Sequence, residues 1–218
     1  MMPTQNALLT SDSSKGRRYV EICRAQYDKA ELQEEEAQVL NEHPGFAAYL
    51  AAGIRRFSQK GPVFPVWLEI EVGGKSKDEL TTLNKGAERE TSNYAADIMG
   101  KDAWKPGQVE VVKFARVKVR ELGFTKNPTT REIWARIEEL GHSLCEPADG
   151  PVLGAAFMDQ PKGDICWTAM KQITASGGSP SVFVLERDDF GDRWLYADWA
   201  GPGDEWDLVD GVVFRLRK

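Results

Sequence analysis

The segment Gly74-Lys75-Ser76 has residue types found in phosphate-binding loops, and it lies between an expected strand and an expected helix. Such a loop requires a glycine five positions before Gly74. The residue there is Glu69, and its negative charge would oppose a phosphate group. The segment is therefore interpreted as a plain turn between a strand and a helix.

Cysteine and histidine offer a second kind of chemistry, because a thiol becomes a nucleophile beside an imidazole base. The chain has the histidines His43 and His142 and the cysteines Cys23, Cys145 and Cys166. His142 and Cys145 form a candidate pair that no neighbouring residue supports, and His142 also suits a helix C-terminus as a cation. The cysteines lack metal-ligand spacing and disulfide density. Buried free thiols are expected, with no metal and no cofactor.

The acidic turn Asp188–Asp192 could supply oxygen ligands to calcium. An EF-hand loop has a glutamate at its twelfth position, and the residue at that position counted from Asp188 is Trp199. The segment is not an EF-hand and is interpreted as a turn between strands, with a looser calcium loop left open. Its carboxylates are an alternative acid–base pair.

Three of the seven tryptophans, Trp194, Trp199 and Trp206, lie within one short segment around a Gly-Pro-Gly turn. Rings of this size can bury ~150–250 Å² each and hold irregular strands together. All three are expected to be buried framework residues. The residues between them are expected to project from loops, which suit adaptable binding.

Composition indicates a globular protein, with 41% hydrophobic residues and a net charge of -6. The segment Glu186–Asp210 holds nine carboxylates and two arginines, so nucleic acid is not an expected partner. No apolar run approaches the ~20 residues of a membrane span. The first residues lack the pattern of a secretory signal, and a cytoplasmic location is expected.

The first half of the chain is expected to begin with two helices. Arg18–Asn41 is rich in helix-forming residues, and Phe46–Phe57 has apolar residues at helical spacing. Val63–Val72 then alternates apolar and polar residues as a half-buried strand does. Ser76 and Glu79 have the spacing of a capping box, which opens a helix.

The second half begins after a further expected helix, Ser92–Met99, with an expected strand at Val109–Val119. A capping box of Thr129 and Glu132 predicts a helix that ends at Gly141, with a buried stripe of Ile133, Trp134, Ile137 and Leu140. No later helix is expected. The remaining expected elements are five strands: Val152–Met158, Cys166–Thr174, Ser181–Arg187, Arg193–Trp199 and Gly211–Leu216.

One strand, one helix and a run of short strands predict an α+β fold. The expected division is a helical N-terminal region at residues 1–62, a small strand–helix segment at 63–107 and an α+β domain at 108–218.

The second half of the chain contains an ordered series of short sequence segments: PTTREIWARIEELGHSLCEPADGP (Pro128–Pro151), DQPKGD, AMKQIT, VFVLERDD, RWLYADWAGPGDEW and VVFRLRK. Upstream, WLEIEVGGKSKDEL and YAADIM extend the series. Together they resemble an uncharacterised bacterial family of candidate phyla and environmental genomes, over about Trp67 to Lys218. The chain differs from the usual sequence of the family at Val152–Ala156 and at Asp192.

Members of that family are similar to the variable proteins of diversity-generating retroelements, in which a reverse transcriptase rewrites adenines at the 3′ end of a target gene. The resemblance implies a C-type-lectin-like domain of one or two helices and several short, mostly antiparallel strands. Its last strand, Val212–Leu216, should then pair beside the first strand of the domain. The implied framework is Trp194, Leu195, Trp199, Pro202, Trp206, Val213 and Phe214. The implied variable, ligand-binding positions are Ala156, Ile165, Trp167, Ser179, Ser181, Val184, Phe190, Tyr196, Ala197, Asp198, Gly201, Asp204, Glu205, Asp207 and Asp210.

The expected function is therefore a ligand-binding scaffold without catalytic activity, whose C-terminal surface is diversified and whose partner is a protein. Two alternatives stay open. One is a hydrolase that uses His142 and Cys145 or the acidic Asp188–Asp192 turn. The other is a regulatory protein-interaction domain.

Overall fold

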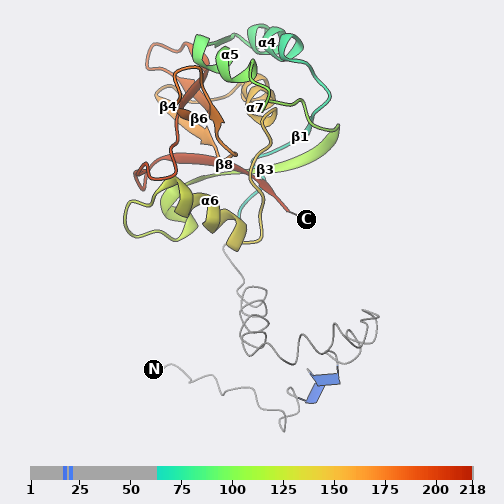
Figure 1. Cartoon of the computed structure of the whole chain (residues 1–218), viewed down its shortest axis with the longest axis vertical. Coiled ribbons are helices and arrows are strands. Elements are labelled where there is room, and N and C mark those ends of the chain that lie inside the picture. Colours follow the sequence, from blue (N-terminus) through green and yellow to red (C-terminus); the bar gives the residue numbers. More distant parts are fainter. Residues whose placement is uncertain (1–16, 19, 22–62, 218) are drawn as a thin grey trace. The chain divides into compact units, whose positions relative to one another are not determined.

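The computed structural model of the chain describes residues 17, 18, 20, 21 and 63–217 (Figure 1). The chain divides into two compact units, Met1–Gln59 and Lys60–Lys218, and the second unit carries the fold described below. Four features expected from the sequence lie outside the described residues: helix Arg18–Asn41 beyond its first turn, helix Phe46–Phe57, His43 and Cys23.

A strongly curled, mixed sheet of eight strands runs through the second unit. Its strands are β1 (Leu68–Val72), β2 (Arg89–Thr91), β3 (Glu110–Lys118), β4 (Asp164–Thr168), β5 (Ile173–Thr174), β6 (Pro180–Arg187), β7 (Arg193–Trp199) and β8 (Gly211–Leu216). They follow the order β1-β3-β8-β4-β6-β7-β2, and β5 pairs with β6.

The last strand pairs with the strand that was expected to begin the domain. β8 lies antiparallel to β3, with Phe214 opposite Ala115, so the predicted pairing is confirmed. β1 also pairs with β3, and β2 pairs with β7. Residues 63–107 therefore contribute strands to the same sheet as the rest of the unit.

Helices α4 (Lys77–Gly86), α5 (Asn93–Met99) and α6 (Thr130–Glu139) lie where the sequence predicts helices. Both predicted capping boxes are present: the Glu79 carboxylate accepts from the Ser76 amide, and the Glu132 carboxylate accepts from the Thr129 amide, each at 2.7 Å. Gly141 follows α6 with a φ of +87°, a conformation that glycine adopts without strain. The predicted helix stripe is buried at Ile133, Trp134 and Ile137 and half-buried at Leu140.

The predicted strand Val152–Met158 is wrong, because most of this segment lies in helix α7 (Asp149–Ala156). Asp149 in its first turn makes two hydrogen bonds with the guanidinium of Arg215, at 2.6 and 2.8 Å. Gly150 lets the helix approach the sheet, since a Cβ there would lie 2.6 Å from Phe183. The periodicity of a short apolar segment does not distinguish a buried helix from a buried strand. These tertiary contacts therefore determine that the segment is a helix.

The predicted strand Cys166–Thr174 is two strands, β4 and β5, with an irregular segment between them. There the Ala169 carbonyl accepts from the Cys145 amide at 2.7 Å. The Met170 carbonyl accepts from the indole of Trp134 at 2.9 Å. These partners replace strand pairing, so the ladder stops after Thr168.

Helices cover opposite faces of the sheet. Figure 1 shows α4, α5 and α7 toward one end of the unit and α6 toward the other. α7 packs on the face of Phe183, while Trp134 of α6 contacts Trp206, which contacts Trp167 on the other face. No helix in the described part of the chain is long and apolar enough to cross a membrane.

Candidate functional site

Strand pairing brings aromatic residues from separate segments to one face of the sheet. Tyr196 of β7 lies opposite Val184 of β6, which lies beside Trp167 of β4. Paired residues point to the same side of a sheet. Tyr94 of α5 joins this row, since its ring lies 5.6 Å from the ring of Tyr196.

A second row runs parallel to the first. Glu90 of β2 pairs with Trp194, Trp194 pairs with Glu186, and Glu186 pairs with Ile165. Asp198 lies two positions beyond Tyr196 on β7 and therefore on the same side. We call this surface the aromatic–acidic face, and its residues are Tyr94, Trp167, Trp194, Tyr196, Ile165, Glu90, Glu186 and Asp198.

The rings of the aromatic–acidic face are accessible from outside. Tyr94 is 61% exposed, and Trp167, Trp194 and Tyr196 are half-buried. The ring of Trp167 packs edge-to-face against the buried ring of Trp206, with the ring centroids 5.4 Å apart. The face thus offers ring surface to a ligand while its rings are held in place.

Helix α5 positions Tyr94. Ser92 caps the helix, and its Oγ accepts from the Ala95 amide at 3.1 Å. Asp97 then accepts from the amide and the hydroxyl of Ser176, at 2.7 and 2.6 Å, which ties α5 to the turn before β6. These hydrogen bonds lower the pKa of the Asp97 carboxyl to about 2.

Arg89 fixes the backbone behind the second row. Two of its N–H groups donate to the carbonyls of Glu186 and Trp194, at 3.1 and 3.0 Å. Others donate to the carbonyls of Gly154 and Phe157 at the C-terminal end of α7, at 2.8 and 3.1 Å, where a cation also favours the helix dipole. Burial lowers the pKa of Arg89 to about 10, so the guanidinium is still charged at neutral pH.

The charge on the face is negative. Three carboxylates project from it, and its positions on β2, β4, β6 and β7 hold no lysine or arginine. The pKa of Tyr196 is raised, first by desolvation and then by Tyr94, Asp198 and Glu186. The surface therefore disfavours added negative charge.

The structure brings together five of the positions that the sequence indicated as ligand-binding: Ile165, Trp167, Val184, Tyr196 and Asp198. The others are distributed elsewhere. Ala156 ends α7, Ser179 precedes β6, Phe190 lies 89% exposed in the β6–β7 turn, and the remainder lie in β6, β7 and the loop before β8.

Three of the indicated positions are buried rather than exposed. Ser181 and Ala197 alternate with the face residues and point to its opposite side, with 4% and 5% exposure. Val184 lies beneath Trp167 and Tyr196 with 3% exposure. They belong to the core because strand alternation and close neighbours cover them.

The prediction that Trp199 is a buried framework residue is also wrong, since its side chain is 72% exposed. It is the last residue of β7 and lies opposite Ser181. Trp206 is buried at 5%, as predicted, and Trp194 is half-buried.

The loop from Gly201 to Asp210 is fixed by its own carboxylates. Asp204 accepts from the Gly201 amide at 2.6 Å, and Asp210 accepts from the Asp207 amide at 2.8 Å. Asp207 accepts from the Asn127 side chain at 2.9 Å. Asp204, Asp207 and Asp210 thus have a structural role in the loop. Glu205 is exposed.

Sequence reasoning did not place four residues of the face at the site: Tyr94, Glu90, Trp194 and Glu186. Alternation along β7 from Tyr196 would have found Trp194. Tyr94 and Glu90 come from a distant segment, and only the pairing of β2 with β7 brings them near.

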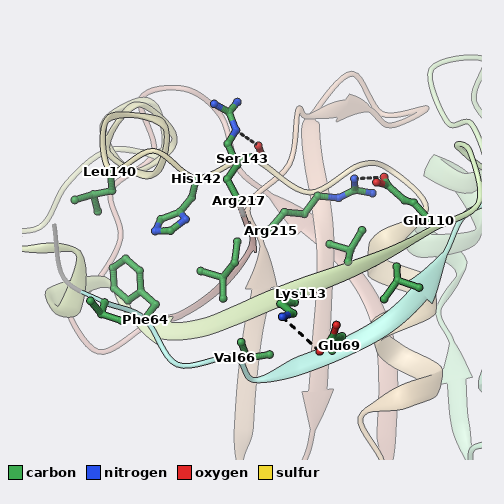
Figure 2. Close-up of a pocket in the computed structure, with 14 residues that line it drawn as sticks. Phe64, Val66, Glu69, Glu110, Lys113, Leu140, His142, Ser143, Arg215 and Arg217 are labelled. Carbon is green, nitrogen blue, oxygen red and sulfur yellow. Dashed lines mark hydrogen bonds and ion pairs between the residues drawn. The ribbon is translucent and has the colours of Figure 1, made fainter. Parts of the chain in front are cut away.

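A cavity of about 1120 Å³ lies at the other end of the unit, between β1, β3, the end of β8 and the segment after α6. Figure 2 shows the imidazole of His142 near Leu140 and Phe64, with the Arg217 guanidinium hydrogen-bonded to the Ser143 hydroxyl nearby. The His142 ring centroid lies 5.5 Å from that of Phe64. Its Nδ1 is buried and makes no hydrogen bond within the described residues.

Cys145 does not face this cavity. Its thiol donates to the carbonyl of Val213 at 3.5 Å, and burial raises its pKa well above the ordinary value. No hydrogen bond joins Cys145 to His142 among the residues described. The geometry of an activated nucleophile and its base is therefore not formed by these two side chains.

The Asp188–Asp192 turn is closed by hydrogen bonds of its own. The Asp188 carboxylate accepts from the amides of Gly191 and Asp192, at 2.7 and 2.9 Å, the pattern of a turn stabilised by an aspartate side chain. In the part of the chain that the structure describes, no cluster of three or more His, Cys, Asp or Glu residues could hold a metal ion.

His142 is expected to titrate below its ordinary pKa of 6.5, because burial and then Arg217 disfavour the imidazolium. Since the folded-state pKa is the lower one, stability should fall as the pH drops through 6.5. NMR titration of the ring protons measures the midpoint, with His142→Gln as the assignment control. In Arg217→Ala the midpoint should rise, whereas Arg120→Ala should leave it unchanged. An unmoved midpoint in Arg217→Ala would contradict the charge effect.

Comparisons with protein-family models, with curated proteins and with solved structures found no match.

Proposed function

We propose that this chain is a ligand-binding scaffold and that the aromatic–acidic face is its binding surface. One observation supports this most directly. Ile165, Trp167, Tyr196 and Asp198 were indicated by the sequence as ligand-binding positions, and strand register gathers them on one accessible face. Aromatic rings among polar groups are typical of adaptable recognition surfaces.

The proposal includes a protein ligand and diversification of this surface by a retroelement acting on the 3′ end of the gene. It also includes a C-type-lectin-like domain from β3 to β8. A strand, the two helices α6 and α7 and then further strands, with β3 and β8 as antiparallel neighbours, support that domain type. Ser181, Val184 and Ala197 are left out of the variable surface because they are buried.

Exchange of residues on the face is expected to leave the fold intact. Most substitutions at Ile165, Tyr196 and Asp198 should change the free energy of unfolding by less than ~1 kcal/mol. Most substitutions at the buried Leu195 and Val212 should unfold the protein. Two libraries of variants, one for the face positions and one for the buried positions, can be displayed on cells and treated with protease. The resistance of each variant to digestion measures its stability.

Equal losses in the two libraries would contradict a variable surface. The DNA beside the gene tests diversification separately: a reverse transcriptase gene is expected, with an imperfect copy of the 3′ end that differs mainly at adenines. A gene without that copy would contradict diversification and leave the binding surface untouched.

A further inference from the structure

We infer that the aromatic–acidic face binds arginine side chains of a basic protein segment. This inference rests on the proposed function and specifies the chemistry of the ligand. Glu90 and Glu186 flank Trp194 on its two neighbouring strands, and Asp198 follows Tyr196 by two positions. Each of these two aromatic residues therefore has an acidic residue on the same side of the sheet, at a backbone spacing of ~5–7 Å along or across the strands.

The carboxylates of the face are not paired with a cation among the residues that the structure describes. Within the described part of the chain, Glu90 and Glu186 form no ion pair and accept no side-chain hydrogen bond, and Asp198 accepts only from the Trp199 amide, at 2.7 Å. The ion pairs of Arg193 with Glu88 and of Lys113 with Glu69 involve none of these carboxylates. A cationic ligand would supply the missing partner.

The mixture of rings and carboxylates favours arginine over other cations. A guanidinium is planar, so it stacks on an aromatic ring while its N–H groups donate to a carboxylate beside that ring. A lysine ammonium is a point charge that gains less from this arrangement. The rings are already positioned, Tyr94 by Tyr196 and Trp167 by Trp206, so little freedom is lost on binding.

The extent of the face suits an extended protein segment. From β2 through β7 and β6 to β4 it crosses three strand spacings, or roughly 14 Å. Aromatic rings also stack on the bases of single-stranded nucleic acids, but the three carboxylates would repel the phosphates. A polypeptide with spaced arginines fits both the length of the face and its negative charge.

The test uses short fluorescent peptides with two arginines in a serine–glycine background, and the full-length protein. Fluorescence anisotropy should detect binding of the arginine peptide, weaker binding of the matched lysine peptide and no binding of the glutamine peptide. The double variant Glu186→Gln, Asp198→Asn should weaken binding about three- to tenfold, and Tyr196→Ala should do the same. The control double variant Asp78→Asn, Glu138→Gln removes the same charge from exposed sites elsewhere and should bind as the wild type does.

Several results would overturn the inference. These are equal weakening by the control pair, equal affinity for lysine and arginine peptides, and binding of a single-stranded oligonucleotide that Tyr196→Ala abolishes. A random peptide library separates this failure from that of the proposed function. Selected peptides without arginine that lose binding in Tyr196→Ala would refute the arginine preference and support the face as a binding surface. Selected peptides that bind Tyr196→Ala and Trp194→Ala as well as wild type would refute both.

Discussion

Replacing Arg89 with alanine is expected to lower the free energy of unfolding by about 4–5 kcal/mol. The side chain is 1% exposed, and its guanidinium donates five hydrogen bonds. Four of the acceptors are backbone carbonyls: two at the C-terminal end of α7, one in β6 and one in β7. The fifth acceptor is the side-chain oxygen of Gln160. Alanine would leave these buried oxygens without a donor, and the penalty for each is of the order of 1–3 kcal/mol.

Denaturant unfolding of three variants tests this prediction. Arg89→Lys keeps the charge but cannot reproduce the planar arrangement of donors, so it should lose about half as much stability. Arg120→Ala, at an exposed position without a side-chain partner in the described residues, should change stability by no more than ~0.5 kcal/mol. Similar midpoints for Arg89→Ala and Arg120→Ala would show that water replaces the guanidinium at little cost.

Replacing Trp206 with alanine is expected to cost about 3–5 kcal/mol. The ring is buried between Trp134 and Trp167, and its indole N–H donates to the Thr130 hydroxyl at 2.8 Å. Trp199→Ala should change stability by less than ~1 kcal/mol, since that ring is 72% exposed. Thermal and denaturant melts of the two variants compare the same chemical change in two environments.

Trp206→Phe extends the comparison, because it keeps most of the ring packing and removes the hydrogen bond to Thr130. It should lose less stability than Trp206→Ala. A loss at Trp199 as large as at Trp206 would mean that Trp199 is covered in solution. The expected exposure of its ring would then be wrong.

Arg89→Ala and Trp206→Ala should also affect binding, in both cases indirectly. Trp206 supports Trp167 of the aromatic–acidic face, and Arg89 bonds to the backbone of Glu186 and Trp194. Both residues are buried, so they act on the face through the residues that they contact. They are positioning residues, whereas Tyr196 and Asp198 would contact the ligand itself.

The sequence by itself determined much of the secondary structure where a local rule applies. Both capping boxes have their predicted hydrogen bonds, because the residues involved lie three positions apart and need no distant partner. The bounds of β7 and β8 agree with the predicted strands. The α+β class and the pairing of the last strand beside β3 were also predicted.

Part of the proposed binding surface could be predicted from the sequence as well. Tyr196 and Asp198 alternate along β7 with the buried Leu195 and Ala197, and a period of two places them on one side. The same rule explains why Ala197 does not belong to that surface, although it was predicted to be a ligand-binding position.

Only the tertiary structure decided features that depend on distant partners. Residues 152–156 form a helix because Arg215 binds Asp149 and Phe183 requires a glycine at position 150. Tryptophan burial likewise depends on what covers each ring, so Trp206 is core and Trp199 is surface. Tyr94 and Glu90 reach the face through the pairing of β2 with β7, about a hundred residues apart in sequence, and no local pattern records a contact of that range.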